Sequence, residues 1–291
     1  MDDNEFLAGQ FEQHRGHLRA VSYRMLGSLS EADDAVQEAW VRLSRSDAEE
    51  IENLGGWLTT VVARVSLNML RARKTRREEP FDERLPDPVV ERVDGDHPEH
   101  EALLADSVGL ALLVVLEQLS PAERLAFVLH DMFAVPFDEI APMVERTPEA
   151  ARQLASRARR RVQGAAPEAP ADRARQREVA EAFQAAAREG DFERLVSVLD
   201  PDVVQRVDFG PDRPIRITVG ADAVAGQAIA FRRVAPGFDT IEAVLVNGTP
   251  GYVVFRGGQP FSLVAFTVAN DRIVAMDIIA DAERLVRLGL G

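Results

Sequence analysis

The stretch LSPAERLAFVLHDMFAVPFDEIAPMVERTPEAARQLASRARRRV, Leu119 to Val162, carries the start signals of three successive helices. Ser120-Pro121-Ala122-Glu123 is a capping box with proline at the first helical position, and it predicts the first of them. Pro136-Phe137-Asp138-Glu139 opens the second, and Thr147-Pro148-Glu149 opens the third. Since only Glu145-Arg146-Thr147 separates the last two, the stretch predicts a helix-turn-helix.

The last helix, Thr147 to Val162, is predicted to present a basic face. At about 100° per residue its small apolar side chains gather on one side. The other side carries hydrogen-bond donors, which are Arg152, Gln153, Ser156, Arg157 and Arg160. A solvated amphipathic helix is the simpler explanation, but such helices mix acids with bases at i,i+4 spacing. Arginine and glutamine here favour reading of guanine and adenine edges and contact with phosphates.

The charge of the chain is unevenly distributed. The formal net charge is -14, yet residues 78–106 hold 11 acids against 2 bases, while residues 107–164 hold 7 of each. The acidic segment also contains four prolines between Glu78 and Glu101, so we predict an irregular linker there. An acidic isoelectric point therefore does not exclude nucleic acid, because the helical segments on either side are near neutral and internally polarised.

The composition excludes several classes of site. The chain has 291 residues, of which 46% are apolar, and it contains no cysteine, so disulfides, thiolate metal sites and cysteine nucleophiles are excluded. It has neither a basic start followed by an apolar run nor a membrane-length stretch of about 18 apolar residues. We therefore expect a soluble, cytoplasmic protein without a metal or cofactor.

The N-terminal part is helical in pattern. Apolar positions from Phe6 to Leu26 and from Ala32 to Leu43 fall on helical stripes. Ser30 is expected to cap the second helix, with Asp33 as the capping-box acid.

A third helix is expected from Gly56 or Trp57 to about Lys74, opening after the breaker pair Gly55-Gly56. It ends in the basic cluster Arg71 to Arg77, which includes Arg73 and Lys74. One or two cations compensate a helix C-terminus, so a cluster of this size favours contact with a phosphate backbone.

After Arg173 the sequence pattern changes from purely helical to mixed helical and β-type, which predicts an α+β domain. Helical patterns at Arg175 to Arg188 and Phe192 to Leu199 precede a series of β-type segments. Those segments are separated by turn signals, which are Asn247-Gly248, Gly257-Gly258 and Asn270-Asp271.

Three strings together resemble a known family: SEADDAVQEAWVRL from Ser30, GGWLTTVVARVSLNMLRARKTRR from Gly55, and the opening stretch. They are similar to regions 2 and 4 of bacterial extracytoplasmic-function sigma-70 factors. The C-terminal domain resembles the SnoaL-like fold fused to one subgroup of these factors. The expected fold class is multidomain, with two all-α domains and an α+β SnoaL-like cone. Its expected boundaries are 1–77 for region 2, 78–106 for the linker, 107–164 for region 4 and 173–291 for the SnoaL-like domain.

The resemblance implies three binding surfaces. The residues matching the core-polymerase surface, which meets the β′ clamp helices, are Asp33, Asp34, Gln37, Glu38 and Trp40. Those matching the surface for the minus-ten element and its melted strand are Asn53, Trp57, Thr60, Arg64, Asn68, Arg71, Arg73 and Lys74. Those matching the minus-thirty-five reader are Thr147, Arg152, Gln153, Ser156, Arg157 and Arg160. Trp57 can equally be a core residue.

The resemblance also implies roles for the linker and the C-terminal domain. In the family the linker threads through the polymerase toward the active-site cleft and the RNA exit channel, and an acidic strand there could imitate nucleic acid. The implied partners in core polymerase are the β′ clamp helices and the β subunit. A disordered solubilising spacer fits the composition as well. The fused domain modulates activity by contacting the sigma domains, and its typical NGxPG turn matches Asn247, Gly248, Pro250 and Gly251. The chain departs from the subgroup at its DGGG-type loop, which here begins Asp208-Phe209-Gly210, and in lacking the linker tryptophan.

Two other functions are weighed against a sigma factor. One is a helix-turn-helix regulator with a C-terminal ligand-binding domain. The other is an isomerase or cyclase, for which the domain offers Asp208, Asp277 and Tyr252 but no histidine, because all histidines precede residue 131. We therefore predict no enzyme activity and no catalytic residues.

Overall fold

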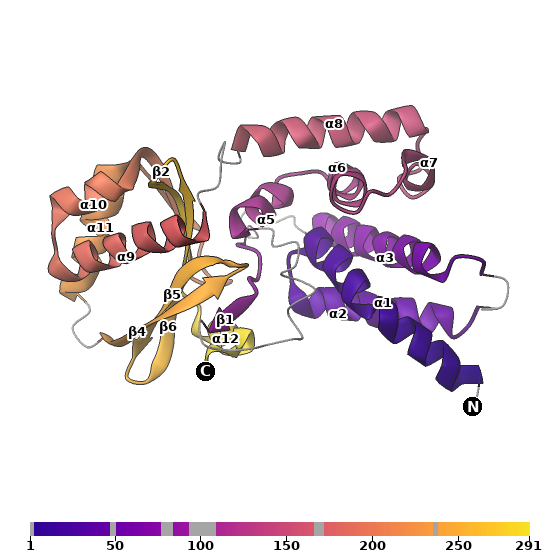
Figure 1. The fold of residues 1–291 in the computed structure, drawn as a ribbon, viewed down its shortest axis with the longest axis horizontal. Helices are drawn as coiled ribbons and strands as arrows, with labels where there is room; N and C mark the ends of the chain where they lie inside the picture. The colour runs from indigo at the N-terminus through magenta and orange to yellow at the C-terminus, as the bar shows by residue number, and fades with distance from the viewer. Residues whose placement is uncertain (1–2, 47–50, 77–83, 93–108, 166–171, 235–237) are drawn as a thin grey trace. The chain divides into compact units, whose positions relative to one another are not determined.

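The computed structural model describes residues 3–46, 51–76, 84–92, 109–165, 172–234 and 238–291. The chain divides into two compact units (Figure 1). The first contains Met1–Glu78, Pro98–Asp106 and Leu112–Ala165; the second contains Glu79–His97, Ser107–Ala111 and Ala166–Gly291. The first unit is helical among its described residues, and the second combines a sheet with helices, as the sequence predicts.

Three helices build the N-terminal part of the first unit: α1 (Asp3–Leu26), α2 (Leu29–Leu43) and α3 (Leu54–Arg76). The prediction that Ser30 caps α2 is wrong. Gly27 ends α1 with a φ of 68°, and Ser28 takes the extended N-cap position without a side-chain cap bond. The left-handed glycine redirects the chain early, so Ser30 lies inside the first turn of α2.

The glycine pair at the start of α3 does not break the helix, contrary to prediction. The helix begins at Leu54, ahead of both glycines, and the Asn53 side chain accepts a hydrogen bond from the Gly56 N–H at 3.0 Å. A Cβ at Gly55 would lie 3.0 Å from the His14 ring, and one at Gly56 would lie 2.8 Å from the Asn53 amide. The glycines therefore allow close approach of other side chains to the start of α3.

The remainder of the first unit contains the helix-turn-helix. α5 (Leu110–Glu117) leads to α6 (Pro121–Phe127), which continues as the π-helical η2 (Val128–Met132), α7 (Phe137–Ile140) and α8 (Pro148–Ala165). The capping box is confirmed, because the Ser120 hydroxyl accepts from the Glu123 N–H and Glu123 accepts from the Ser120 N–H. Glu145 adopts a φ of 56° in the turn before α8.

The second unit is built on a seven-stranded sheet with the order β1-β4-β5-β6-β7-β2-β3. Neighbouring strands are antiparallel except β2 and β7, which run parallel. The strands are β1 (Val90–Arg92), β2 (Leu199–Asp208), β3 (Arg216–Val219), β4 (Phe238–Val246), β5 (Thr249–Arg256), β6 (Gln259–Ala269) and β7 (Arg272–Ile279). The predicted turns are confirmed between β4 and β5, between β5 and β6, and between β6 and β7. Both residues of each predicted dipeptide have positive φ, as tight hairpin turns require.

Three helices cover one face of this sheet: α9 (Arg173–Glu189), α10 (Phe192–Val198) and α11 (Ala221–Val234). Their apolar side chains form a core with Tyr252, Phe266 and Met276 of the sheet. The sequence did not predict α11. The chain ends in α12 (Ala282–Leu285) and η3 (Val286–Leu290).

Strand β1 lies within the segment predicted to be an irregular linker. It pairs antiparallel with β4, placing Val90 opposite Val246 and Arg92 opposite Val244. The prediction of an irregular segment is therefore wrong for Val90–Arg92, since the edge of β4 supplies the backbone partners that local sequence does not indicate. Most of the acidic segment, residues 78–83 and 93–106, lies outside the described residues.

Candidate nucleic-acid interface and linker-binding site

Helix α8 presents the predicted minus-thirty-five residues together. Arg152, Gln153, Ser156, Arg157 and Arg160 are exposed, while Ala151, Ala155 and Ala158 are buried against the rest of the unit. The remaining predicted residue, Thr147, lies just before the helix, where its hydroxyl accepts from the Ala150 N–H at 3.3 Å. The helix-turn-helix thus carries an exposed row of donors on a rigid element.

Several arginines of α8 are already paired with acids of the preceding helices. Glu123 lies 3.3 Å from the Arg157 Nε and 3.0 Å from an Arg161 nitrogen, and Asp131 accepts from the Arg159 Nε at 2.8 Å. The Arg152 guanidinium lies 5.2 Å from the centre of the Phe137 ring. The sequence identified the basic face but not which of its cations are neutralised.

The predicted minus-ten residues follow one stripe of α3. Arg64, Asn68 and Arg71 are exposed at i, i+4 and i+7 spacing, and Trp57 and Thr60 continue the stripe as half-buried residues. Asn53 is exposed and lies just before α3, where its side chain accepts the hydrogen bond from the Gly56 N–H. The Lys74 side chain lies outside the described residues.

Arg73 is a structural residue in this unit. It pairs with Glu31, donates to the Leu26 carbonyl at 3.1 Å and lies 3.8 Å from Glu117. Its side chain is only 23% exposed. The prediction that Arg73 belongs to an open nucleic-acid surface does not fit this geometry, because its donors face protein groups.

A fully buried arginine joins the two halves of the first unit. Arg124 on α6 donates from its Nε to the Arg24 carbonyl on α1 at 3.1 Å, and it pairs with Glu117 at 2.9 Å. Burial lowers the Arg124 pKa, and the Glu117 carboxylate opposes that shift. Since a buried cation without partners is costly, this network helps to fix how α6 packs against α1.

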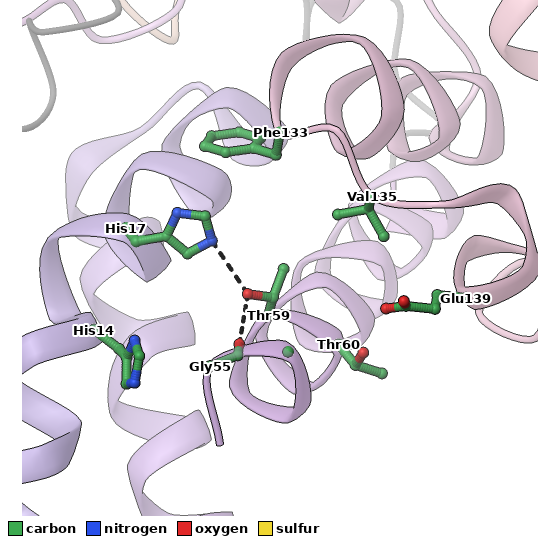
Figure 2. Close-up of a pocket in the computed structure, with 9 residues that line it drawn as sticks. His14, His17, Gly55, Thr59, Thr60, Phe133, Val135 and Glu139 are labelled. Atoms are coloured by element: carbon green, nitrogen blue, oxygen red, sulfur yellow. Dashed lines mark hydrogen bonds between the residues drawn. The ribbon is translucent and has the colours of Figure 1, made fainter. Parts of the chain in front are cut away.

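A pocket of about 320 Å³ lies where α1 and the start of α3 meet the segment after η2 (Figure 2). It is lined by His14, His17, Gly55, Gly56, Thr59, Thr60, Phe133, Val135 and Glu139. His17 lies 3.2 Å from the Thr59 hydroxyl, and its ring stands edge-on to Phe133. Burial lowers the His17 pKa, with further lowering by His14 and Arg24. Residues of the helix-turn-helix part, Phe133, Val135 and Glu139, therefore line the same pocket as the start of the predicted minus-ten helix.

The predicted polymerase-binding residues lie on α2. Asp34, Gln37 and Glu38 are exposed, as a docking surface requires. Asp33 pairs with Arg19 at 2.7 Å, and the Trp40 ring packs 5.1 Å from that of Phe11. The exposed face is acidic, although Asp33 and Trp40 are partly engaged within the unit.

In the second unit, Asp208 at the end of β2 binds the segment before β1. Its fully buried carboxylate accepts from Arg84 at 2.9 Å, from the Leu85 N–H at 3.1 Å and from Arg284 at 2.8 Å. Arg284 also donates to Asp87 at 2.6 Å. The departure from the DGGG-type loop thus retains an aspartate that anchors the linker segment.

The predicted regulatory turn holds the same segment from β4. The Asn247 side chain accepts from the Val89 N–H at 2.7 Å, and the Asn247 N–H donates to the Val89 carbonyl at 2.8 Å. Asn247 and Gly248 have φ values of 49° and 75°. A Cβ at Gly251 would lie 2.6 Å from Val246 and from the Val264 carbonyl, so glycine is required there.

Comparisons with known proteins agree across both units. The family model described as Sigma-70 region 2 matches residues 10–76, and that described as Sigma-70, region 4 matches residues 109–162. The ECF RNA polymerase sigma factor SigJ of Mycobacterium tuberculosis is 39% identical over 94% of this chain and 92% of its own length. This chain belongs to the extracytoplasmic-function RNA polymerase sigma factors.

Two further matches cover nearly the whole of this sigma factor. The crystal structure of Mycobacterium tuberculosis SigJ matches with a TM-score of 0.78 and 36% identity, covering 96% of this chain and 98% of that one. The probable ECF sigma factor SigI of the same organism is 33% identical, over 98% of this chain and 97% of its length. The second unit is therefore shared with full-length relatives. Sigma factors bind core RNA polymerase and promoter DNA to initiate transcription and are not enzymes; the separate regulator alternative is not favoured.

The residues considered for isomerase chemistry have structural partners in this sigma factor. Asp208 holds the linker segment, and Asp277 pairs with Arg206 at 3.0 Å. Burial raises the Asp277 pKa against the opposing effect of Arg206, and burial raises the Tyr252 pKa to about 12. Tyr252 packs in the helix-covered core beside Phe266.

The sequence missed the linker-binding residues, although it contained a signal for them. The two cations of the acidic segment, Arg84 and Arg92, both pair with acids of the second unit, Asp208 and Glu242. The two isolated cations of this acidic segment therefore mark where it binds to the rest of the second unit.

Searches of the described parts of the chain gave two negative findings. No group of three or more histidine or acidic side chains there is arranged to hold a metal ion. None of the helices described is both long and apolar enough to cross a membrane.

Proposed function

We propose that α8 reads the minus-thirty-five element and that the stripe on α3 binds the minus-ten element and its melted strand. The observation that carries this proposal is the exposed donor row of Arg152, Gln153, Ser156 and Arg160 on a helix-turn-helix. Arginine and glutamine side chains have the fork geometry that recognises guanine and adenine edges in the major groove.

The α3 stripe has the features needed to hold an opened strand. Arg64 and Arg71 supply exposed cations along the helix, and Asn68 supplies an amide between them. A single strand is held by a basic track together with groups that receive unstacked bases. Thr60, toward the N-terminal end of the stripe, lines the pocket of Figure 2.

The α2 face supplies the polymerase contact in this proposal. Asp34, Gln37 and Glu38 form an exposed polar and acidic face that complements a basic partner such as the β′ clamp helices. The linker then runs along the β and β′ subunits toward region 4. This places the protein with RNA polymerase in the cytoplasm.

The free chain holds the α3 stripe partly covered. Thr60 faces Phe133 and Glu139 across the pocket, and Arg71 lies 3.6 Å from Glu145 of the helix-turn-helix. Engagement of the α3 stripe with DNA therefore requires region 4 to move, and binding to core polymerase supplies the energy for that movement.

The C-terminal domain regulates initiation in this proposal by holding the linker segment. Asp208 and Asn247 fix residues 84–90, the segment that connects regions 2 and 4. Since both regions must contact polymerase at separate places, restraint of their connection limits the geometries that they can reach.

Strand opening tests the assignment of α3. Alanine at Arg64 and Asn68 should reduce permanganate reactivity of unpaired thymines in complexes of core polymerase, the full chain and a promoter. Binding to core polymerase should remain. Arg45→Ala, which removes an exposed cation at the end of α2, is the matched control. Equal opening by the double variant and the control would contradict the assignment.

A further inference from the structure

The exposed side of α8 has a crest and two flanks. At about 100° per residue, the crest residues Arg152, Gln153, Ser156 and Arg160 fall within a sector of about 100°. Arg157 and Arg161 lie on one flank, rotated further toward α6, and Arg159 lies on the opposite flank beside η2. The flanks and the crest differ in what their side chains contact.

Glu123 holds the α6 flank. Its carboxylate is only 8% exposed, and it lies 3.3 Å from Arg157 and 3.0 Å from Arg161. The same carboxylate accepts from the Ser120 hydroxyl at 2.7 Å and from the Ser120 N–H at 3.2 Å. It is therefore fixed by the capping box and forms a rigid anchor.

The charge on this anchor is stable near neutral pH. Burial acts to raise the Glu123 pKa, but hydrogen bonds from Ser120 and the charges of Arg161 and Arg157 bring it below its usual value. In contrast, within the described residues, Arg152 and Arg160 on the crest have no carboxylate within ion-pair distance.

We infer that Glu123 is a positioning residue for minus-thirty-five recognition, which holds Arg157 and Arg161 as phosphate contacts and leaves base contacts to the crest. This inference rests on the proposed role of α8. An arginine reads guanine with two parallel donors of its fork. Arg157 has its Nε edge against Glu123, so only its outer donors remain for DNA. Phosphate contacts then set the register of the helix without reading sequence.

The inference predicts a change of specificity when Glu123 loses its charge. Glu123→Gln keeps the capping box, because glutamine accepts the same bonds from Ser120. It releases both arginines from their anchor. The matched control is Asp138→Asn, which removes one negative charge from an exposed position on α7 that has no arginine partner among the described residues.

The test is a selection with the complete holoenzyme, made from core polymerase and the full-length chain. The probe is a pool of promoter duplexes randomised at the minus-thirty-five element. We expect Glu123→Gln to alter the preference at one or more base pairs by about fivefold or more, with guanine favoured. Its binding should also depend more steeply on salt, by about one unit in the logarithmic slope. Asp138→Asn should select the wild-type sequences.

Arg157→Ala gives an independent check, since an exposed side chain is removed without disturbing the capping box. We expect equal weakening of binding to all selected sequences. If Arg157→Ala instead loses its preference at a single base pair, the inference is overturned. It is also overturned if Glu123→Gln selects the same sequences as the wild type and binds with the same salt dependence. If the wild-type holoenzyme enriches no sequence, the proposed function of α8 fails and this inference with it.

Discussion

At the scale of single residues, Asp208 shows how a buried charge is held. Four donors converge on its carboxylate: Arg84, the Leu85 N–H, the Gly210 N–H and Arg284. Such complete partnering offsets the cost of removing the charge from water. The donors come from the linker segment, from the loop after β2 and from α12, so the residue ties three parts of the second unit together.

Asp208→Ala should therefore destabilise the second unit strongly. Arg284, which is 8% exposed, would lose one of its two carboxylate partners, and breaking a buried pair costs about 3–5 kcal/mol. Urea denaturation of the full chain measures the loss. Asp271→Asn, which breaks the exposed pair with Arg175, should change stability little. Similar effects of the two substitutions would contradict the proposed anchor.

We expect His17, whose ring is partly buried, to give the first unit a modest dependence on pH. Burial lowers its pKa below the usual value of 6.5, so the unfolded chain takes up a proton more readily than the folded one. The stabilising contribution is complete above about pH 6.5 and is lost as the pH falls through that value toward the lower folded pKa.

We therefore expect the unfolding temperature to fall between about pH 7 and pH 5, and to fall less in His17→Gln. Thermal denaturation across this range, monitored by circular dichroism, measures the difference. His14→Gln should also lessen the fall, but by a smaller amount, because His14 contributes to the lowering of the His17 pKa while burial of His17 remains. Identical pH profiles for wild type and His17→Gln would rule out this role.

At the scale of elements, β1 depends on the turn between β4 and β5. Asn247→Ala should speed amide exchange at Val89–Arg92, because loss of a buried acceptor costs about 1–3 kcal/mol, or about 5- to 150-fold in exchange. Asn270→Ala is the matched control, since Asn270 has the same φ of 49° but lies in a different turn. Equal acceleration by both variants would show that turn strain, rather than the Val89 contact, holds the strand.

Elements with local signals were predictable from sequence. The capping box at Ser120, the turn before α8 and the left-handed dipeptides between strands each depend on neighbouring residues, and each is confirmed. Helix α11 and strand β1 were not predictable in this way. α11 combines many small residues with Gly226 and is fixed by packing into the sheet core, whereas β1 is fixed by the edge of β4.

The candidate site divides in the same manner. Helical spacing predicts which side chains of α8 and α3 share a face. It does not reveal that Arg73 turns inward to Glu31, which lies 42 residues away in sequence. Nor does it reveal that Glu123 holds Arg157 and Arg161, which lie 34 and 38 residues away. Long-range ion pairs therefore decided which predicted cations face outward.

At the scale of the whole molecule, the regulation that we propose rests on the C-terminal domain. Deleting residues 173–291 removes Asp208 and Asn247 and so releases the linker segment. We expect the truncated chain to bind core polymerase and to change promoter output by a factor of several. Quantitative run-off transcription at equal holoenzyme concentration measures this. Unchanged output would contradict regulation through the linker.

The central claim is that this chain directs core polymerase to promoters through α3 and α8. The most direct measurement is transcription start-site mapping in a reconstituted system with core polymerase, genomic DNA and the full chain. We predict discrete start sites that appear only when the chain is present and that weaken with Gln153→Ala or Arg160→Ala. The absence of any chain-dependent start site would contradict the account.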